Sequence, residues 1–302
     1  MVQRLLAVGC LFVVLASGRL PAPAHAASTP FTRAVYVSAA DSAGNFVPNL
    51  GASDFIVKEG GKAREVVGVT SASEPMQIAL LVDDNGTGIF RAGVARFVQR
   101  LLGHAEFGLS VVVGQTQKLV DFTTDVKLLS DGINGLTARP GTPDGGQLLE
   151  GIYDAAKELS HREAKRPVIV VLTVGGEEHS TRSSHNVLDQ LQQSGASMHV
   201  FLIVNNGLRA TVDVRKPGAL LDENHALGEV LGDGPKQSGG RREELVATSG
   251  VVASLEELAE ELMHQYLITY ALPDGVKPSN KLTISPNRPG VSLRAPTRVP
   301  SP

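Results

Sequence analysis

Two adjacent carboxylates stand at the end of an apolar run and could hold a cation. The run 78–82 is followed by Asp83, Asp84, Asn85, a glycine and Thr87. Carboxylate, amide and hydroxyl oxygens are the ligands that Mg²⁺ takes in proteins, often with one or two carboxylates. The same side chains could instead cap a following helix, whose first N–H groups and dipole favour a negative charge. The sequence leaves both roles open.

A second group of titratable side chains lies further along the chain. Glu177, Glu178, His179 and His185 form the only histidine–acid cluster of the sequence. Their spacing matches no standard zinc site or hydrolase motif. We interpret the cluster as a polar loop that leaves a strand and enters a helix.

Other enzyme signatures are missing from the sequence. There is no Gly-x-Ser-x-Gly motif, which would place a serine nucleophile on a sharp turn. The glycine-rich segment 141–146 lacks the Lys-Ser or Lys-Thr that ends a phosphate-binding loop. The sequence therefore predicts that the protein is not an enzyme.

The first 26 residues have the three parts of a signal peptide. Arg4 gives the positive start, 5–17 the apolar run, and Ala24-His25-Ala26 the cleavage pattern. As a helix the run is about 20 Å long, against about 30 Å of hydrocarbon. Cys10, the single cysteine, lies inside it, so cleavage leaves no disulfide or thiolate chemistry. We expect a periplasmic or extracellular protein, with no membrane insertion after cleavage.

Composition narrows the class of partner. The formal net charge is -3, so no positive surface for nucleic acid is expected. Aromatic residues make up 4% of the chain and Trp is absent, which disfavours a platform for stacking bases or sugars. The remaining expectation is a protein partner, whose identity the sequence does not give.

The chain divides into a small β unit, a larger α/β domain and a C-terminal part. Segment 31–74 has period-two alternation and turn residues, including the hairpin turn 59–62. From 75 to 265, apolar strands alternate with amphipathic helices, which predicts a doubly wound, mostly parallel sheet covered on both faces. Within it we expect a long flexible loop at 205–240. Residues 266–302 form C-terminal strands and a tail.

The individual elements of the α/β domain follow from hydrophobic periodicity. Strands are predicted at 77–82, 107–113, 118–122, 167–173 and 197–204. Helices are predicted at 90–102, 126–136, 147–159, 183–194, 243–248 and 255–265. Near the end, the segments 281–285 and 291–295 are expected to pair.

Three short segments resemble the ion site of the von Willebrand factor A family. That family's first loop reads Asp-x-Ser-x-Ser, and here it is Asp83-Asp84-Asn85-Gly86-Thr87. Its second loop has a Thr after two glycines, where this chain has Gln147. Its third has an Asp after a strand ending in Leu-Thr, where this chain has Val174. The flanks 35–69 and 247–270 resemble the exported branch known from acidobacterial sequences.

The resemblance implies a von Willebrand factor A fold and a metal-ion-dependent adhesion site. Its ligands here would be Asp83, Asn85, Thr87 and Gln147, holding Mg²⁺ or Mn²⁺ if the site works. Because Val174 supplies neither charge nor oxygen, we expect a degenerate site. The loops expected to contact a partner contain Asp84, Gly86, Thr142, Asp144 and Glu177.

The expected function is non-catalytic protein binding by an exported module, through loops at the carboxyl ends of the strands. One alternative is a structural or assembly component of an envelope complex that uses the small β unit. A less favoured alternative is a metal-dependent hydrolase that uses the His179 and His185 loop.

Overall fold

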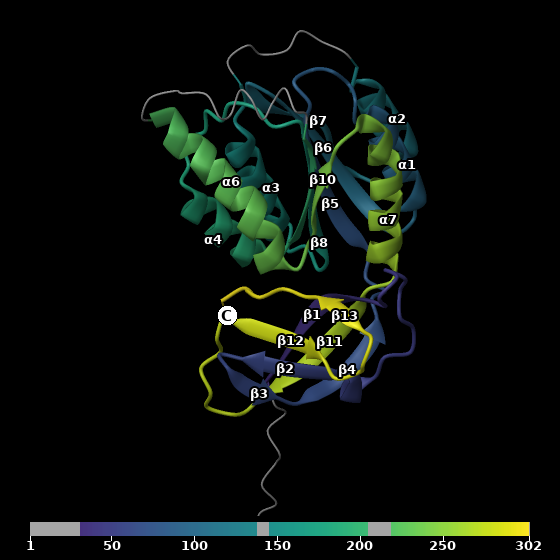
Figure 1. Ribbon diagram of the computed structural model, residues 1–302, viewed down its shortest axis with the longest axis vertical. Helices are drawn as coiled ribbons and strands as arrows, with labels where there is room; N and C mark the ends of the chain where they lie inside the picture. The colour runs from purple at the N-terminus through teal and green to yellow at the C-terminus, as the bar shows by residue number, and fades with distance from the viewer. Residues whose placement is uncertain (1–30, 138–144, 205–218, 302) are drawn as a thin grey trace, which may run out of the picture.

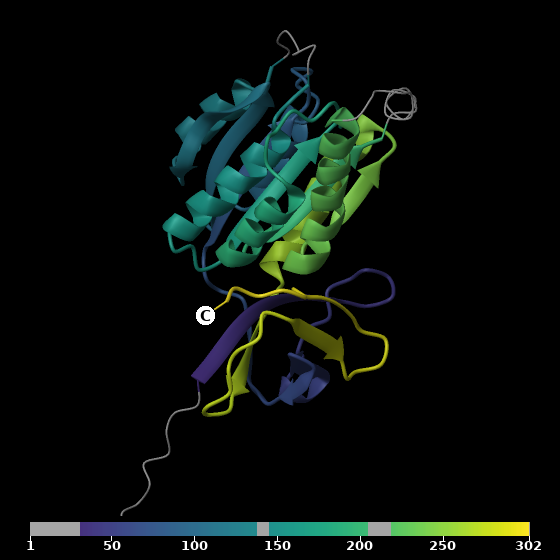
Figure 2. The ribbon, with the colours of Figure 1, turned by 90° about the vertical axis from the view of Figure 1, so that its left-hand side faces the viewer.

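The computed structural model describes residues 31–137, 145–204 and 219–301, and the expected leader lies outside them. Figure 1 shows a large domain above a smaller β unit, with elements labelled along the chain. Viewed from the side in Figure 2, the small unit lies beneath one end of the large sheet.

The large domain is built on a six-stranded sheet whose order is β10-β9-β8-β5-β6-β7. All neighbours are parallel except β6 and β7, which form an antiparallel pair at one edge. The strands are β5 Met76–Asp83, β6 Ala105–Val113, β7 Gln115–Thr123, β8 Pro167–Thr173, β9 Ser197–Ile203 and β10 Arg242–Leu245. This is the predicted doubly wound, mostly parallel α/β class.

Helices cover both faces of this sheet, as Figure 1 shows. The first layer holds α1 Arg91–Arg100, α2 Val126–Asn134 and α7 Val251–Met263. The second holds α3 Leu148–His161, α4 Ser184–Ser194 and α6 Ala219–Ser238. Short 3-10 turns occur at Ala52–Asp54 and Thr248–Gly250.

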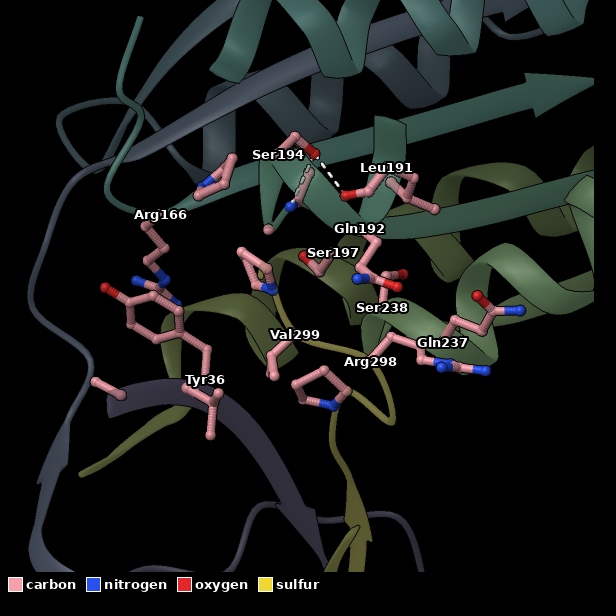
Figure 3. A pocket seen from close by; sticks show the side chains of 18 of the residues that line it. Tyr36, Arg166, Leu191, Gln192, Ser194, Ser197, Gln237, Ser238, Arg298 and Val299 are labelled. Carbon is pink, nitrogen blue, oxygen red and sulfur yellow. Dashed lines mark hydrogen bonds between the residues drawn. The ribbon is translucent and has the colours of Figure 1, made fainter. Parts of the chain in front are cut away.

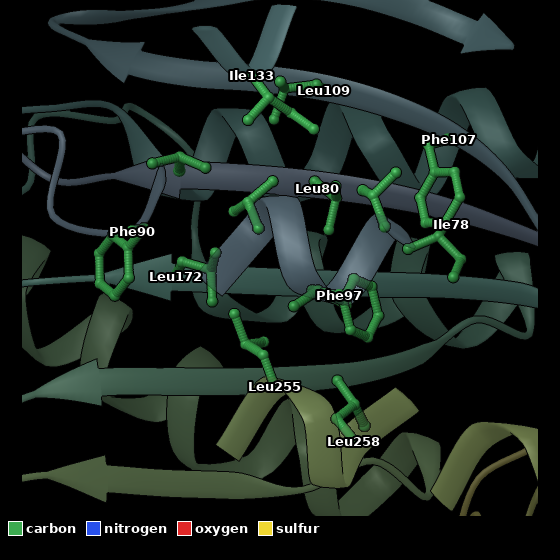
Figure 4. Close-up of a cluster of buried hydrophobic side chains, with 14 of the residues drawn as sticks. Ile78, Leu80, Phe90, Phe97, Phe107, Leu109, Ile133, Leu172, Leu255 and Leu258 are labelled. Carbon is green, nitrogen blue, oxygen red and sulfur yellow. The ribbon is translucent and has the colours of Figure 1, made fainter. Parts of the chain in front are cut away.

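The alternation of side chains along a strand divides the core into two layers. On β5, Ile78 and Leu80 face the layer that contains Phe97 and Leu255, shown in Figure 4. Ala79 and Leu81, which alternate with them along the strand, face the opposite layer. Because both sides are covered, the strand is apolar throughout, as the run in the sequence predicted.

Both flanks of the chain build the small unit. Strands β1 Phe31–Ala40, β4 Val66–Ser71, β11 Tyr266–Leu272 and β13 Ser292–Arg294 form an antiparallel sheet in the order β13-β1-β11-β4. Strands β2 Phe55–Glu59, β3 Lys62–Arg64 and β12 Leu282–Pro286 form a second sheet in the order β12-β2-β3. The predicted pairing of 281–285 with 291–295 is therefore wrong, because β12 pairs with β2 and β13 with β1.

Part of the expected flexible loop at 205–240 is helical, which corrects that prediction. Helix α6 buries Leu227, Val230 and Leu231, a stripe with helical spacing. Its glycines and Pro235 hide the pattern, since both residue types are poor helix formers. Gly234 serves packing, because a Cβ there would lie 2.8 Å from the methyl of Met198. Residues 205–218 lie outside the described part.

The helix predicted at 243–248 is also wrong. Residues Arg242–Leu245 form β10 and pair in parallel with β9. The segment is only four residues long and three of them are charged. Hydrophobic periodicity therefore does not distinguish a strand from a turn of helix there. Within the described residues, no helix has the length and apolar character needed to cross a membrane.

We predict that Phe97→Ala lowers the free energy of unfolding by about 3–5 kcal/mol, the usual cost of removing a buried aromatic side chain. Phe97 is fully buried and packs edge-on against Phe107, with ring centroids 6.3 Å apart. Urea denaturation followed by circular dichroism measures the loss. Leu102→Ala, at an exposed position beyond α1, is the control and should cost far less. Equal losses for the two variants would contradict the assigned core.

Candidate functional site

The candidate site lies where the order of the large sheet reverses. In chain order its strands run 3-2-1-4-5-6, so β5 and β8 are neighbours whose connections leave in opposite directions. Open α/β sheets bind ligands beyond the carboxyl ends of the strands at such a point. Asp83 and Thr173 end these two strands and are register partners.

The side chains of Asp83 and Thr173 contact each other directly. The Thr173 hydroxyl donates to Asp83 Oδ2 at 2.6 Å and accepts the Gly175 N–H at 2.9 Å. The Val174 N–H donates to the Asp83 carbonyl oxygen at 3.0 Å. Thr173 is fully buried. Sequence reasoning used this threonine only as the end of a strand motif and missed its contact with Asp83.

Burial raises the pKa of the Asp83 carboxyl from 3.8 to about 7. The Thr173 hydroxyl opposes this shift because it hydrogen-bonds the charged form. The nearby carboxylates of Glu178 and Asp84 add to the shift by repulsion. Near neutral pH, Asp83 therefore holds a proton in part of the molecules, and a cation at this point would favour its release.

Asp84 organises the first loop. Its Oδ1 accepts the Gly86 N–H at 2.9 Å and its Oδ2 the Gly88 N–H at 2.5 Å. The Thr87 hydroxyl donates to the Asp84 carbonyl oxygen at 2.9 Å. Asp84 is buried, so both of its carboxylate oxygens serve the backbone of its own loop. The expectation that Asp84 contacts a partner stays a prediction.

The second and third loops bind each other through Glu178. This buried carboxylate accepts the Leu148 N–H at 3.1 Å and the Ser180 N–H at 2.9 Å. Gly146 donates its N–H to the Glu177 carbonyl oxygen at 3.0 Å. The start of α3 is thus fixed to the loop after β8, and burial raises the pKa of Glu178.

Glycine is required where these two loops meet. Gly145 has φ +81°, and a Cβ there would lie 2.2 Å from the Glu177 carbonyl oxygen. A Cβ on Gly146 would lie 3.8 Å from Asp83 Oδ1. The second loop therefore approaches Asp83 closely through its backbone.

The predicted metal ligands occupy different surroundings at this edge. Asn85 and Thr87 are exposed in the first loop, whereas Asp83 is only partly exposed. Gln147 precedes α3 and donates its N–H to the Gly114 carbonyl oxygen at 2.8 Å. Among the residues described, no three His, Cys, Asp or Glu side chains are grouped so as to hold a metal ion.

The predicted partner-binding residues are only partly described. Glu177 has an exposed side chain at this edge, whereas Gly86 is buried in the first loop. Thr142 and Asp144 lie outside the described residues. The role of these residues in binding stays a prediction.

The two histidines of the polar loop have separate partners. His185 Nε2 lies 3.1 Å from Asp189 Oδ2, one turn along α4, with a largely exposed ring. His179 Nε2 lies 3.8 Å from Glu177 Oε2, and the His179 main-chain N–H donates to the Gly146 carbonyl oxygen at 2.9 Å. This arrangement agrees with the interpretation of a polar loop that enters a helix.

Comparison with known proteins gives structural neighbours only. No protein-family model and no curated protein matches the sequence. A von Willebrand factor type A protein from Catenulispora acidiphila is similar over 85% of this chain and 76% of its own, with 11% identity and a TM-score of 0.44. The corresponding domain of the type V pili tip protein Mfa5 from Porphyromonas gingivalis covers 63% and 95%, with 11% identity and a TM-score of 0.42.

A third neighbour is the conserved hypothetical protein BatB from Bacteroides thetaiotaomicron. It covers 62% of this chain and 98% of its own, with 15% identity and a TM-score of 0.38. Similarity at this level concerns the fold and carries no functional argument. The large domain has the doubly wound, mostly parallel sheet that the resemblance to the von Willebrand factor A family implied, with Asp83 at the end of β5. The narrower likeness to the acidobacterial-type branch stays a prediction.

We predict that Asp83→Asn removes part of the pH dependence of stability. Because the folded pKa is raised to about 7, the proton on Asp83 stabilises the fold fully below about pH 4, and this contribution is lost as the pH rises through 7. The variant should therefore match the parent near pH 4.5 and exceed it at pH 8. Urea midpoints at both pH values test this.

Asp154→Asn, at an exposed position on α3, is the matched control and should leave the difference between the two pH values unchanged. An Asp83→Asn midpoint that falls below that of the parent at pH 8 would contradict the raised pKa.

Proposed function

We propose that this protein is an exported, non-catalytic protein-binding module whose metal-ion-dependent adhesion site is degenerate. Its binding face would be the three loops at the carboxyl edge of the large sheet. The observation that carries the proposal is the convergence of these loops on Asp83, at the switch point between β5 and β8.

The degenerate site is supported by how the carboxylates are used. Asp84 and Glu178 each accept backbone N–H groups through both carboxylate oxygens. One carboxylate oxygen of Asp83 accepts the Thr173 hydroxyl. Val174 offers no side-chain oxygen where the family has an aspartate. Mg²⁺ demands near-octahedral oxygen ligation at about 2.0–2.1 Å, so this donor set does not fit the family's ion.

The absence of catalysis is supported by the same contacts. The Asp83 loop lacks a nucleophile with a neighbouring general base, since the Thr87 hydroxyl donates to the main chain. His179 and His185 have separate carboxylate neighbours, which removes the geometric basis for a shared metal. Export rests on the signal-peptide pattern of the first 26 residues.

A second candidate function is assembly through the small β unit. This unit carries exposed apolar side chains at Phe31, Phe46, Ile56 and Val67. Scattered exposed apolar residues are common on monomers, so they rank below the converging loops as an indication of a binding face.

We predict that the chain gains Mg²⁺ binding when the family's two missing side chains are restored. The double variant Gln147→Thr, Val174→Asp should show a rise in melting temperature with 10 mM MgCl₂, because binding to the folded state alone stabilises it by about 2.7 kcal/mol at 100 times Kd. The parent chain should show no rise. Differential scanning calorimetry with and without EDTA measures both.

The matched control is Gln193→Thr, Val174→Asn, which changes a helix surface position and adds no carboxylate. A Mg²⁺-dependent rise in the parent chain would show that its own site works and would contradict the degenerate assignment.

We predict that binding of the protein's partner survives removal of divalent metal but is lost when the loops are altered. Tagged chain from residue 27 would capture partners from a native envelope extract in Mg²⁺ and EDTA arms, read by mass spectrometry. Asn85→Arg with Thr87→Arg places two bulky charges on exposed loop positions and should remove the captured protein. Ile56→Arg with Val67→Arg, on the small unit, is the matched control and should leave it.

The opposite pattern, with loss only for the small-unit variant, would favour the assembly function. Capture confined to the Mg²⁺ arm would show a working ion site.

A further inference from the structure

A cleft of about 400 Å³ lies between the small unit and the large domain. Its walls come from β1, the start of β8, the ends of α4 and α6 and the C-terminal segment, as Figure 3 shows. These elements meet at the edge where the parallel strands begin, opposite Asp83. Small-molecule sites occupy about 300–1,000 Å³ and occur preferentially at domain interfaces.

The lining of this cleft is mostly apolar, and its charged side chains are all positive. Leu188, Leu191 and Val299 are among its apolar side chains. Its charged residues are Arg33, Lys165, Arg166 and Arg298, and no Asp or Glu is among the described residues that line it. The Arg33 guanidinium pairs at 2.8 Å with Glu59, a carboxylate that it shares with Arg64. Among the described residues, no carboxylate pairs with Lys165, Arg166 or Arg298.

Arg166 is a buried cation held only by neutral groups. Its exposed fraction is 4%, and its Nη2 donates to the Leu262 carbonyl oxygen and, at 3.0 Å, to Gln265 Oε1. Its Nη1 donates to the Glu74 carbonyl oxygen at 3.4 Å. Its Nε has no hydrogen-bond partner among the described residues. Buried charges are normally paired with an opposite charge, whereas this buried guanidinium has no carboxylate partner among the described residues.

Tyr36 completes the charged end of the cleft. Its ring centroid lies 5.1 Å from the Arg166 guanidinium carbon, and Figure 3 shows the two side chains facing each other. A ring face attracts the cation but does not neutralise it. The cleft thus joins one buried positive charge without a carboxylate partner to an apolar wall.

The two helix ends at the cleft do not cancel this charge. Helix C-termini carry partial negative charge on unbonded carbonyl groups. At α6, the Gln237 carbonyl oxygen accepts the N–H groups of Thr297 and Arg298. At α4, the Leu191 carbonyl oxygen accepts the Ser194 hydroxyl, and the Gln192 carbonyl oxygen accepts the Gly195 N–H. These carbonyl groups are already bonded within the protein.

We propose that this cleft binds a small monocarboxylic acid with an apolar chain, whose carboxylate pairs with Arg166 and whose chain lies along the apolar wall. A single negative charge matches the one buried guanidinium, whereas Lys165 is exposed and already solvated. The site is separate from the loops of the proposed function, since it lies at the opposite edge of the large sheet.

The test is calorimetric titration of the chain from residue 27 with three ligands of equal chain length: sodium octanoate, 1-octanol and octylamine. Octanoate should bind with a saturable one-to-one isotherm. Octanol should bind at least tenfold more weakly, and octylamine should give no measurable binding. Equal affinities for octanoate and octanol, or no binding of octanoate, would overturn the proposal.

Variants of residues that line the cleft test whether octanoate binds there. Arg166→Met should weaken octanoate binding at least tenfold and leave octanol unchanged. Because Arg166 also bonds carbonyl groups of the fold, a second variant keeps it intact: Gln192→Trp fills the cleft from its wall and should abolish binding. Gln193→Trp, exposed on the same helix and outside the lining, is the matched control. Binding that survives Gln192→Trp would locate the site elsewhere and overturn the proposal.

Discussion

One buried carboxylate, Glu59, ties together the parts of the chain that flank the large domain. It lies 2.8 Å from the Arg33 guanidinium and 3.5 Å from that of Arg64, and the Tyr270 hydroxyl donates to it at 3.4 Å. Arg33 also donates to the carbonyl oxygen of Ser279, 246 positions away. Removing one member of such a group would leave a buried charge unpaired, which is strongly destabilising. The β unit therefore forms only when both flanks are present.

The joining of the two flanks in the small unit determines where the large domain and the C-terminal segment lie. Pairing of β1 with β11 brings the ends of the large domain together, at an entropy cost that grows slowly with the length enclosed. It also seats the C-terminal segment against the end of α6, where Thr297 and Arg298 bond Gln237. The large sheet thus has two different edges. At one, Asp84 and Glu178 are tied to loop backbone, and at the other Arg166 is buried without a counter-ion.

The sequence predicted the elements whose signal is local. Apolar runs gave β5 and β8, and amphipathic spacing gave α1, α3 and α4, close to their observed bounds. Helix α6 was missed because its glycines and Pro235 weaken the local helix signal, and because Gly234 serves a contact with the distant Met198 that no local pattern records. The placement of β12 and β13 depends on partners at the other end of the chain.

The candidate site, like the fold, was only partly predictable from the sequence. Asp83 was found from its position after a buried strand, because strand ends gather at one edge of a parallel sheet. The hydrogen bond from Thr173 and the loop-binding role of Glu178 depend on three-dimensional approach and were not predicted. Arg166 gave no signal, since a lone arginine before a strand resembles any surface residue until the second unit covers it.

The placement of both flanks in the small unit has a mechanical consequence. The chain enters the large domain after β4 and leaves it after α7, at the same end, so the domain is inserted as a side branch (Figure 1). Tension applied between the two flanks would load the strands of the small unit first. The six-stranded sheet and its loops would stay unloaded until β11 separated from both β1 and β4. The loops at the carboxyl edge of the large sheet are thereby shielded from force along the chain.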